Sequence, residues 1–231
     1  MPPPVDLPSP GPMVRQMMVE RMSVIVVTDR KTLGDLSGRG VTGQVEADDA
    51  DGGSAAPISP DGYFITADHV LARMAGRNVF VVCKLGGRLR SEKARVVWRS
   101  FESDLALLHI PAKTPYFYRW TSPEKWIPEG TPIIHGGIST GLRSTVGKME
   151  SSIPPDRPWT GSTRFKIDIP LEPGDSGGPI VNGVGALIGI NSAVEFLVPL
   201  ETAFFVESEA NRPNIAKIED LINRDRARNG G

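Results

Sequence analysis

Short runs rich in Val, Ile, Phe and Thr recur along this chain, and Gly, Pro, Asp and Asn separate them. β-Branched and aromatic residues favour strands, whereas the separating residues favour turns. On this pattern we predict strands at residues 23–28, 40–47, 63–67, 78–84, 94–98, 105–110, 131–135, 144–150, 164–169, 179–181, 186–191 and 203–207. About a dozen short strands are typical of an all-β fold, and this number fits two antiparallel barrels of about six strands each.

Two tetrapeptides predict sharp chain reversals between these runs. Residues 59–62 read SPDG and residues 182–185 read NGVG, and Asp-Gly and Asn-Gly both favour tight hairpin turns. The last predicted element is a short C-terminal helix behind an N-cap at Asn214. Its apolar positions follow helical spacing: Ile215, Ile218, Leu221 and Ile222.

Composition divides the chain into three segments. Residues 1–20 begin MPPPVDLPSPGP and are expected to form a Pro-rich, disordered tail or linker, with a helix-permissive stretch at 14–22. Residues 21–210 contain the predicted barrels. Residues 211–231 contain the predicted C-terminal helix.

Charge and hydropathy argue against several kinds of partner. The net charge of −1 lacks the basic excess that is typical of nucleic-acid binding. No apolar run approaches the ~20 residues of a membrane-spanning helix, and the run at 24–27 is too short for the core of a signal peptide. We therefore expect no nucleic-acid partner and no membrane span. The protein either stays inside the cell or has a leader that is missing from this chain.

Cys83 is the only cysteine, so the chain cannot form an intramolecular disulfide. It lies in the strand-like run NVFVVCKL without a neighbouring base or metal-ligand spacing. This context favours a packed core residue over a reactive thiol. No motif indicates a metal ion or a cofactor, and we expect neither.

The stretch PLEPGDSGGPI at residues 170–180 raises the question of whether Ser176 is a nucleophile or only a turn residue. A nucleophilic serine needs a histidine base, an acid that orients this base, and backbone donors for the oxyanion. His69 follows an apolar run and an Ala-Asp pair, which would hold its imidazole at the end of a strand. His109 lies inside a strand-like run, and His135 precedes two glycines of a loop-like stretch.

The orienting acid has four candidates. Asp104 precedes the apolar run LALLHI, which can hold a carboxylate at a buried edge, although acids also cap strands. Asp61 and Asp168 compete with it. Asp68 is adjacent to His69, and adjacent strand residues point apart, which makes it a poor orienting group.

The order His69, Asp104, Ser176 and the sequence around each residue resemble the trypsin and chymotrypsin superfamily. GDSGGP resembles its nucleophile motif, TADHVL its histidine block and SDLALLHI its aspartate block. Within the superfamily the chain is most similar to bacterial HtrA-type proteases, over residues 58–110 and 168–193. The resemblance implies a chymotrypsin-like fold with its site in the cleft between two barrels. It also implies a serine endopeptidase that acts on polypeptides.

The same resemblance implies a role for each residue. His69 is the general base and then the general acid, Asp104 fixes its tautomer, and Ser176 attacks the scissile carbonyl. The backbone N–H groups of Gly174 and Ser176 form the expected oxyanion hole. Glycine is expected at position 174 because a side chain would obstruct the backbone conformation and the close approach.

The substrate-specificity pocket is expected along residues 170–172 and 190–193. The position six before the serine is acidic in trypsin-like enzymes that cleave after Lys or Arg, and it is Pro170 here, which disfavours basic side chains. Aliphatic and small polar side chains in the expected wall predict a preference for small or medium uncharged residues, although Glu172 is near enough to recruit a basic one. The residues assigned to this pocket are Pro170, Leu171, Glu172, Ile190, Asn191, Ser192 and Ala193.

Some features depart from the family pattern. HtrA-type chains usually carry a peptide-binding PDZ domain after the protease, and too few residues follow Asn211 here for one. Asp175 matches the acid that pairs with a freed amino terminus in zymogen-activated enzymes, yet the Pro-rich start shows no activation sequence. Asp168 matches an HtrA-type position that is expected to be structural rather than catalytic.

A second class of function stays open, a catalytically inactive binding or scaffold protein with a protease fold. Such proteins typically lose a catalytic residue, whereas this chain keeps all three with the glycine loop intact. The family resemblance suggests the bacterial envelope or periplasm as the compartment. The sequence leaves the oligomeric state open.

Overall fold

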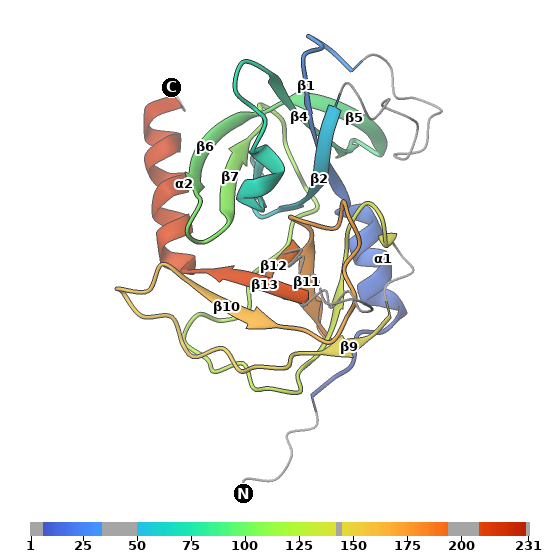
Figure 1. Cartoon of the computed structure of the whole chain (residues 1–231), viewed down its shortest axis with the longest axis vertical. Coiled ribbons are helices and arrows are strands. Elements are labelled where there is room, and N and C mark those ends of the chain that lie inside the picture. Colours follow the sequence, from blue (N-terminus) through green and yellow to red (C-terminus); the bar gives the residue numbers. More distant parts are fainter. Residues whose placement is uncertain (1–6, 34–49, 142–144, 194–207, 230–231) are drawn as a thin grey trace, which may run out of the picture.

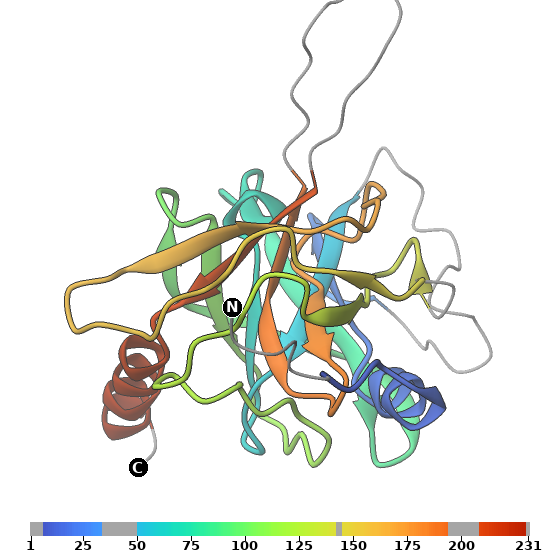
Figure 2. The same cartoon turned by 90° about the horizontal axis from the view of Figure 1, so that it is seen from below.

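The computed structural model describes residues 7–33, 50–141, 145–193 and 208–229. The strands predicted at 40–47 and 203–207 lie outside these residues. The described chain folds into two curled antiparallel sheets, with one helix on each side of the molecule (Figures 1 and 2). This architecture confirms the all-β, chymotrypsin-like fold that the sequence predicts.

The first sheet has seven strands in the order β5-β4-β1-β2-β3-β7-β6. A one-turn 3-10 helix, η1 (Asp68–Leu71), follows its third strand. The strands are β1 (Ser23–Thr28), β2 (Ala50–Pro57), β3 (Tyr63–Thr66), β4 (Asn78–Leu85), β5 (Arg88–Lys93), β6 (Arg95–Ser100) and β7 (Leu105–His109).

The second sheet has six strands in the order β10-β13-β12-β11-β8-β9. Its central pairs are antiparallel, with Ile180 opposite His135 and Ser192 opposite Glu209. The strands are β8 (Pro132–His135), β9 (Gly147–Lys148), β10 (Ser162–Lys166), β11 (Pro179–Asn182), β12 (Leu187–Ala193) and β13 (Ser208–Pro213).

Two hairpins form where the turn sequences predict them. Residues 59–62 connect β2 to β3, which pair with Pro57 opposite Phe64. Residues 182–185 connect β11 to β12, and within this turn the N–H of Gly185 donates to the carbonyl of Asn182 at 2.9 Å. Local turn chemistry was therefore sufficient to locate both reversals.

The helices pack at opposite edges of the molecule (Figures 1 and 2). Helix α2 (Ile215–Asn229) begins at the predicted cap, because Asn214 Oδ1 accepts the N–H of Lys217 at 3.1 Å. Helix α1 (Pro12–Glu20) occupies much of the segment that the sequence analysis assigns to a disordered tail. Its Val14 and Met18 are buried against the second sheet, which explains why this proline-rich segment is helical from residue 12.

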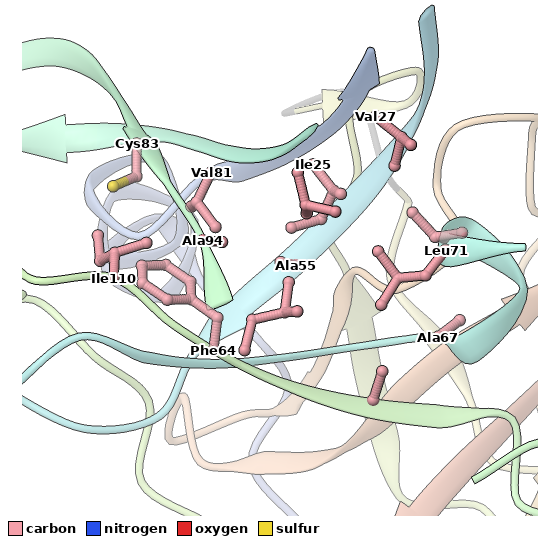
Figure 3. Packing of buried hydrophobic residues seen from close by; sticks show 14 of the residues in the cluster. Ile25, Val27, Ala55, Phe64, Ala67, Leu71, Val81, Cys83, Ala94 and Ile110 are labelled. Atoms are coloured by element: carbon pink, nitrogen blue, oxygen red, sulfur yellow. The ribbon is translucent and has the colours of Figure 1, made fainter. Parts of the chain in front are cut away.

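Each sheet encloses its own apolar core, and a third cluster joins them. Figure 3 shows the first core, where Ile25 and Val81 face Phe64 and Ile110. Burying a side chain of this size contributes about 1.5–3 kcal/mol. Strand β1 is buried at every position because its alternate residues, Val24 and Val26, join a separate cluster on the other face. Cys83 lies inside the first core, as predicted.

Two strands of the first sheet were not predicted from the sequence. Strand β5 reads RLRSEK and β2 reads ADGGSAAP, and charged residues, Gly, Asp and Ala are depleted in strands. Strand β2 forms nonetheless because its glycines allow close packing. A Cβ at Gly53 would lie 2.6 Å from the Val70 side chain and 3.0 Å from the carbonyl oxygen of Ser176. The same small residues bring β2 against the loop that carries Ser176.

Candidate active site

His69 is presented by η1, directly after β3 ends. Its Nδ1 lies 3.0 Å from Oδ1 and 2.9 Å from Oδ2 of Asp104, and its backbone N–H donates to Asp104 Oδ1 at 2.9 Å. The His69 side chain is 43% exposed and that of Asp104 is 15% exposed. The carboxylate therefore fixes the ring from the protein side and leaves the other ring nitrogen free to face solvent.

Asp104 sits in a strained turn before β7. Its φ of 47° makes it the only residue other than glycine with positive φ in the part of the chain that the structure describes. Such a conformation costs about 1–2 kcal/mol, and strain of this kind concentrates at functional sites. Burial opposes ionisation of this carboxyl, but hydrogen bonds from His69 and Ser192 outweigh it and hold the pKa of Asp104 below its ordinary value.

The three competing acids are engaged elsewhere. Asp68 forms a two-point ion pair with Arg99 of β6, with Oδ1 at 2.6 Å from Nε. Asp61 pairs with Arg226 of α2 in the same way. Asp168 accepts the backbone N–H of Lys148 at 2.5 Å. These contacts leave Asp104 as the acid that orients His69.

The other histidines have structural surroundings. The His109 ring packs against Tyr63 in a tilted arrangement with ring centroids 4.5 Å apart, and its Nε2 contacts the carbonyl of Asp61 at 3.1 Å. His135 is fully buried on β8, where desolvation lowers its pKa. Its Nδ1 lies 3.3 Å from Nδ2 of Asn191.

Ser176 lies on the turn between β10 and β11, 7% exposed, and its carbonyl accepts the N–H of Ser54 from β2 at 2.8 Å. Ser176 and His69 line one cleft of about 430 Å³, together with Gly174, Leu171 and Arg73. The Ser176 hydroxyl makes no hydrogen bond to any described residue. In the absence of substrate, catalytic hydrogen bonds are often long or poorly aligned.

Gly174 adopts a φ of 98°, which favours glycine, and a Cβ there would lie 2.7 Å from the side chains of Ile138 and Ser139. Neither its N–H nor that of Ser176 donates to another described residue. Two unpaired backbone donors beside a serine are the arrangement that an oxyanion hole requires.

The residues assigned to the specificity pocket divide among several environments. Leu171 lines the cleft with Ser176, whereas Pro170 and Glu172 line a neighbouring hollow of about 350 Å³ with Ser139 and Thr140.

The strand residues of that assignment lie on β12. Ile190 is buried in the cluster between the sheets, and Ala193 ends the strand opposite Ser208. The Asn191 side chain donates to the carbonyls of Gly136 and Asp175, both at 3.2 Å. Ser192 donates to Oδ2 of Asp104. Asn191 and Ser192 therefore contact the loops that carry Asp175 and Asp104, a placement that the sequence pattern did not predict.

The described residues contain no cluster of His, Cys, Asp and Glu side chains suited to hold a metal ion. Among them there is also no helix long and apolar enough to cross a membrane.

A two-barrel fold with a histidine–aspartate pair and a serine in one cleft defines the class of chymotrypsin-like proteins. Residues 53–190 match the model of the trypsin-like peptidase domain, and the chain belongs to this family. The resemblance proposed from GDSGGP and its companion motifs is thereby confirmed.

Similar proteins carry the names of HtrA-type proteases. A probable periplasmic serine endoprotease DegP-like of Pseudomonas fluorescens is 29% identical over 198 residues, which cover 78% of this chain and 40% of the relative. A serine protease Do-like HtrA of Lactobacillus helveticus is 33% identical over 137 residues, covering 57% and 32%. The aligned parts thus span less than half the length of these relatives.

Solved structures share the fold at low identity. The HtrA-type protease AlgW with a tripeptide matches with a TM-score of 0.59 and 22% identity, covering 90% of this chain and 61% of that one. Deg5 matches with a TM-score of 0.59 and 17% identity, covering 90% of each chain.

Proposed function

We propose that this protein is a serine endopeptidase that hydrolyses polypeptides through His69, Asp104 and Ser176. The observation that carries the proposal is the contact of His69 Nδ1 with Asp104 Oδ2 at 2.9 Å, on the wall of the cleft that Ser176 also lines. The names of the relatives, serine endoprotease and serine protease, support the same reaction class.

In the proposed mechanism, the Ser176 hydroxyl attacks the scissile carbonyl and gives its proton to Nε2 of His69. Asp104 keeps the proton of Nδ1 in place and stabilises the imidazolium that forms. The N–H groups of Gly174 and Ser176 donate to the oxyanion. His69 then protonates the leaving amine. In the second half, His69 deprotonates a water molecule that attacks the acyl carbon, and returns this proton to Ser176 Oγ as the acyl–oxygen bond breaks.

The test is turnover of an unfolded protein such as casein together with labelling by a fluorophosphonate, which reacts with activated serines. We expect the wild-type chain to do both. Ser176→Ala and His69→Ala should lose nearly all activity, because triad residues act as a unit. Ser122→Ala is the matched control, because it removes an exposed hydroxyl at a residue that does not line the cleft. Full peptidase activity of Ser176→Ala would exclude the proposed nucleophile.

We further propose a preference for small or medium uncharged residues before the cleaved bond. Pro170 stands where enzymes specific for Lys or Arg carry an acid, and Leu171 adds an apolar side chain to the cleft. The carboxylate of Asp51, also in the cleft wall, is already paired with Arg77. A peptide-library profile dominated by Lys or Arg would contradict this preference.

The names of the DegP-like relatives, which include the word periplasmic, support a cell-envelope location for the proposed activity. A purely binding or scaffold role is the second candidate, favoured by the Ser176 hydroxyl, which donates no hydrogen bond to the part of the chain that the structure describes. Fluorophosphonate labelling that depends on His69 separates the two, since a scaffold needs no activated serine.

A further inference from the structure

Asp175, next to the proposed nucleophile, is a completely buried carboxylate. Its Oδ1 accepts the N–H groups of Ser139 at 3.2 Å and Thr140 at 3.0 Å. Its Oδ2 accepts the N–H of Glu172 at 3.1 Å and the hydroxyl of Thr140. A carboxylate offers about four lone-pair positions, and these four neutral donors fill them. Among the described residues, the carboxylate is thus held by neutral donors, three of them from the loop at residues 137–141.

The fit between this loop and Asp175 is close. A Cβ at Gly137 would overlap the carboxylate of Asp175, so only glycine allows the contact. The loop closes on itself through the N–H of Gly141, which donates to the carbonyl of Gly137 at 2.8 Å. Residues 137–141 therefore form a defined turn that is anchored on Asp175.

The same loop reaches the first oxyanion donor. The Ser139 hydroxyl donates to the carbonyl of Pro173. A trans peptide is planar, so its C=O and N–H point in opposite directions. Holding the Pro173 carbonyl toward Ser139 turns the N–H of Gly174 away from the loop, and Gly174 lines the cleft.

The second oxyanion donor is held by the same principle. The carbonyl of Asp175 accepts the Nδ2 of Asn191 at 3.2 Å and the N–H of Gly178 at 2.9 Å. This fixes the orientation of the following N–H, that of Ser176. The carbonyl of Gly174 also accepts a hydrogen bond from the Ser54 hydroxyl at 2.7 Å, which fixes its orientation.

We propose that Ser139 and Thr140 are positioning residues of the oxyanion hole: Thr140 anchors the 137–141 loop on Asp175, and Ser139 sets the direction of the Gly174 N–H. This inference rests on the proposed peptidase function. It gives Asp175 a partner that the sequence analysis could not name. It also gives the hydroxyl groups of Ser139 and Thr140, which lie outside the proposed triad, a role in orienting the oxyanion donors.

The experiment compares steady-state kinetics on one fluorogenic peptide for the wild type, Ser139→Ala and Thr140→Val. Loss of an entire oxyanion donor costs about 10²–10³ in kcat, so a donor that is present but misdirected should cost on the order of tenfold. We expect kcat to fall by this factor with KM unchanged. Affinity for a peptide aldehyde, which forms a tetrahedral adduct on the serine, should fall in parallel. Thr140→Ser and Ser139→Thr keep the hydroxyl and should restore kcat.

Matched controls are Thr163→Val on β10 and Ser122→Ala, which remove hydroxyls outside the loop. Urea unfolding of each variant distinguishes a loss of folding from a misdirected Gly174 N–H in a folded protein. If Thr140→Val does not fold, the kcat of Ser139→Ala tests the inference. The inference alone is overturned if the wild type reacts with fluorophosphonate and the kcat of Ser139→Ala stays within twofold of the wild-type value. A wild type without labelling or turnover overturns the proposed function and the inference with it.

Discussion

Ser192, on β12 of the second sheet, donates a hydrogen bond from its hydroxyl to the carboxylate of Asp104, which precedes β7 of the first sheet. The acid that orients His69 is therefore held from both sheets. The two residues are 88 positions apart in the sequence, and their contact joins the two walls of the site. It explains why the wall residue predicted to touch substrate instead faces the proposed triad.

Ser192→Ala should weaken the orientation of His69. The variant removes a charge-assisted donor, and we expect kcat/KM to fall about tenfold, equivalent to about 1.4 kcal/mol. With one donor lost, the pKa of Asp104 rises toward its ordinary value. A lowered carboxyl pKa adds stability that is present above the ordinary pKa and is lost as the pH falls through the lowered value, so the stability of Ser192→Ala should fall less steeply in acid than that of the wild type. A kcat/KM equal to that of Ser122→Ala would contradict this role.

Gly174→Ala should remove activity by two routes. A Cβ would lie 2.7 Å from Ile138 and Ser139, and the φ of 98° disfavours any side chain. We expect kcat to fall by about 10² or more because the N–H of Gly174, the proposed first oxyanion donor, moves. Gly130→Ala is the matched control, since φ is 79° there and no atom lies within 4 Å of the added Cβ. Backbone strain of about 1–2 kcal/mol should then appear in Gly130→Ala without a change in kcat.

The Asp61–Arg226 pair, which links α2 to the β2–β3 hairpin, should make stability depend on acid pH. The hydrogen bond from Arg226 lowers the pKa of Asp61 from 3.8 to about 2, against the effect of burial. The pair therefore stabilises the fold above pH 4, and this contribution is lost as the pH falls from about 4 to about 2. Arg226→Gln should flatten that part of the profile and cost at most about 1 kcal/mol, because the two side chains are 44% and 43% exposed and solvent screens the pair.

The measurement for this pair is urea unfolding at a series of pH values. Arg228→Gln, which changes an exposed arginine of the same helix, is the control. Identical pH profiles for Arg226→Gln and the wild type would show that the pair does not contribute.

Cys83 should be unreactive in the folded protein. Burial raises its pKa to about 12, so almost no thiolate is present at pH 8, and its sulfur lies within the first core (Figure 3). Iodoacetamide should label it only after the chain is unfolded in urea, as detected by mass spectrometry. Rapid labelling under native conditions would show that the first sheet opens readily or that the packing is wrong.

The sequence by itself determined the features that depend on neighbouring residues. Alternating β-branched runs and turn dipeptides define the all-β class, and Asn214 before an amphipathic run defines the start of α2. The GDSGGP motif singled out Ser176 as the proposed nucleophile, because a nucleophile loop needs glycine at fixed positions in the chain. These signals are local, so a linear pattern contains them.

Tertiary structure decided which groups meet across the chain. Strand β5 is rich in charged residues, and its sequence shows no local preference for a strand. It forms because it pairs with the edge of β4, where Cys83 lies opposite Arg90. The contact from Ser54 to Gly174 crosses 120 positions, and those from Ser139 and Thr140 to Asp175 cross 36 and 35. Serine and threonine in loops are common, so their meaning depends on what the fold brings within hydrogen-bond distance. The partner of Asp175 could be read only from the folded molecule, because the pairing of β8 with β11 brings together two loops that are about 35 residues apart in the chain.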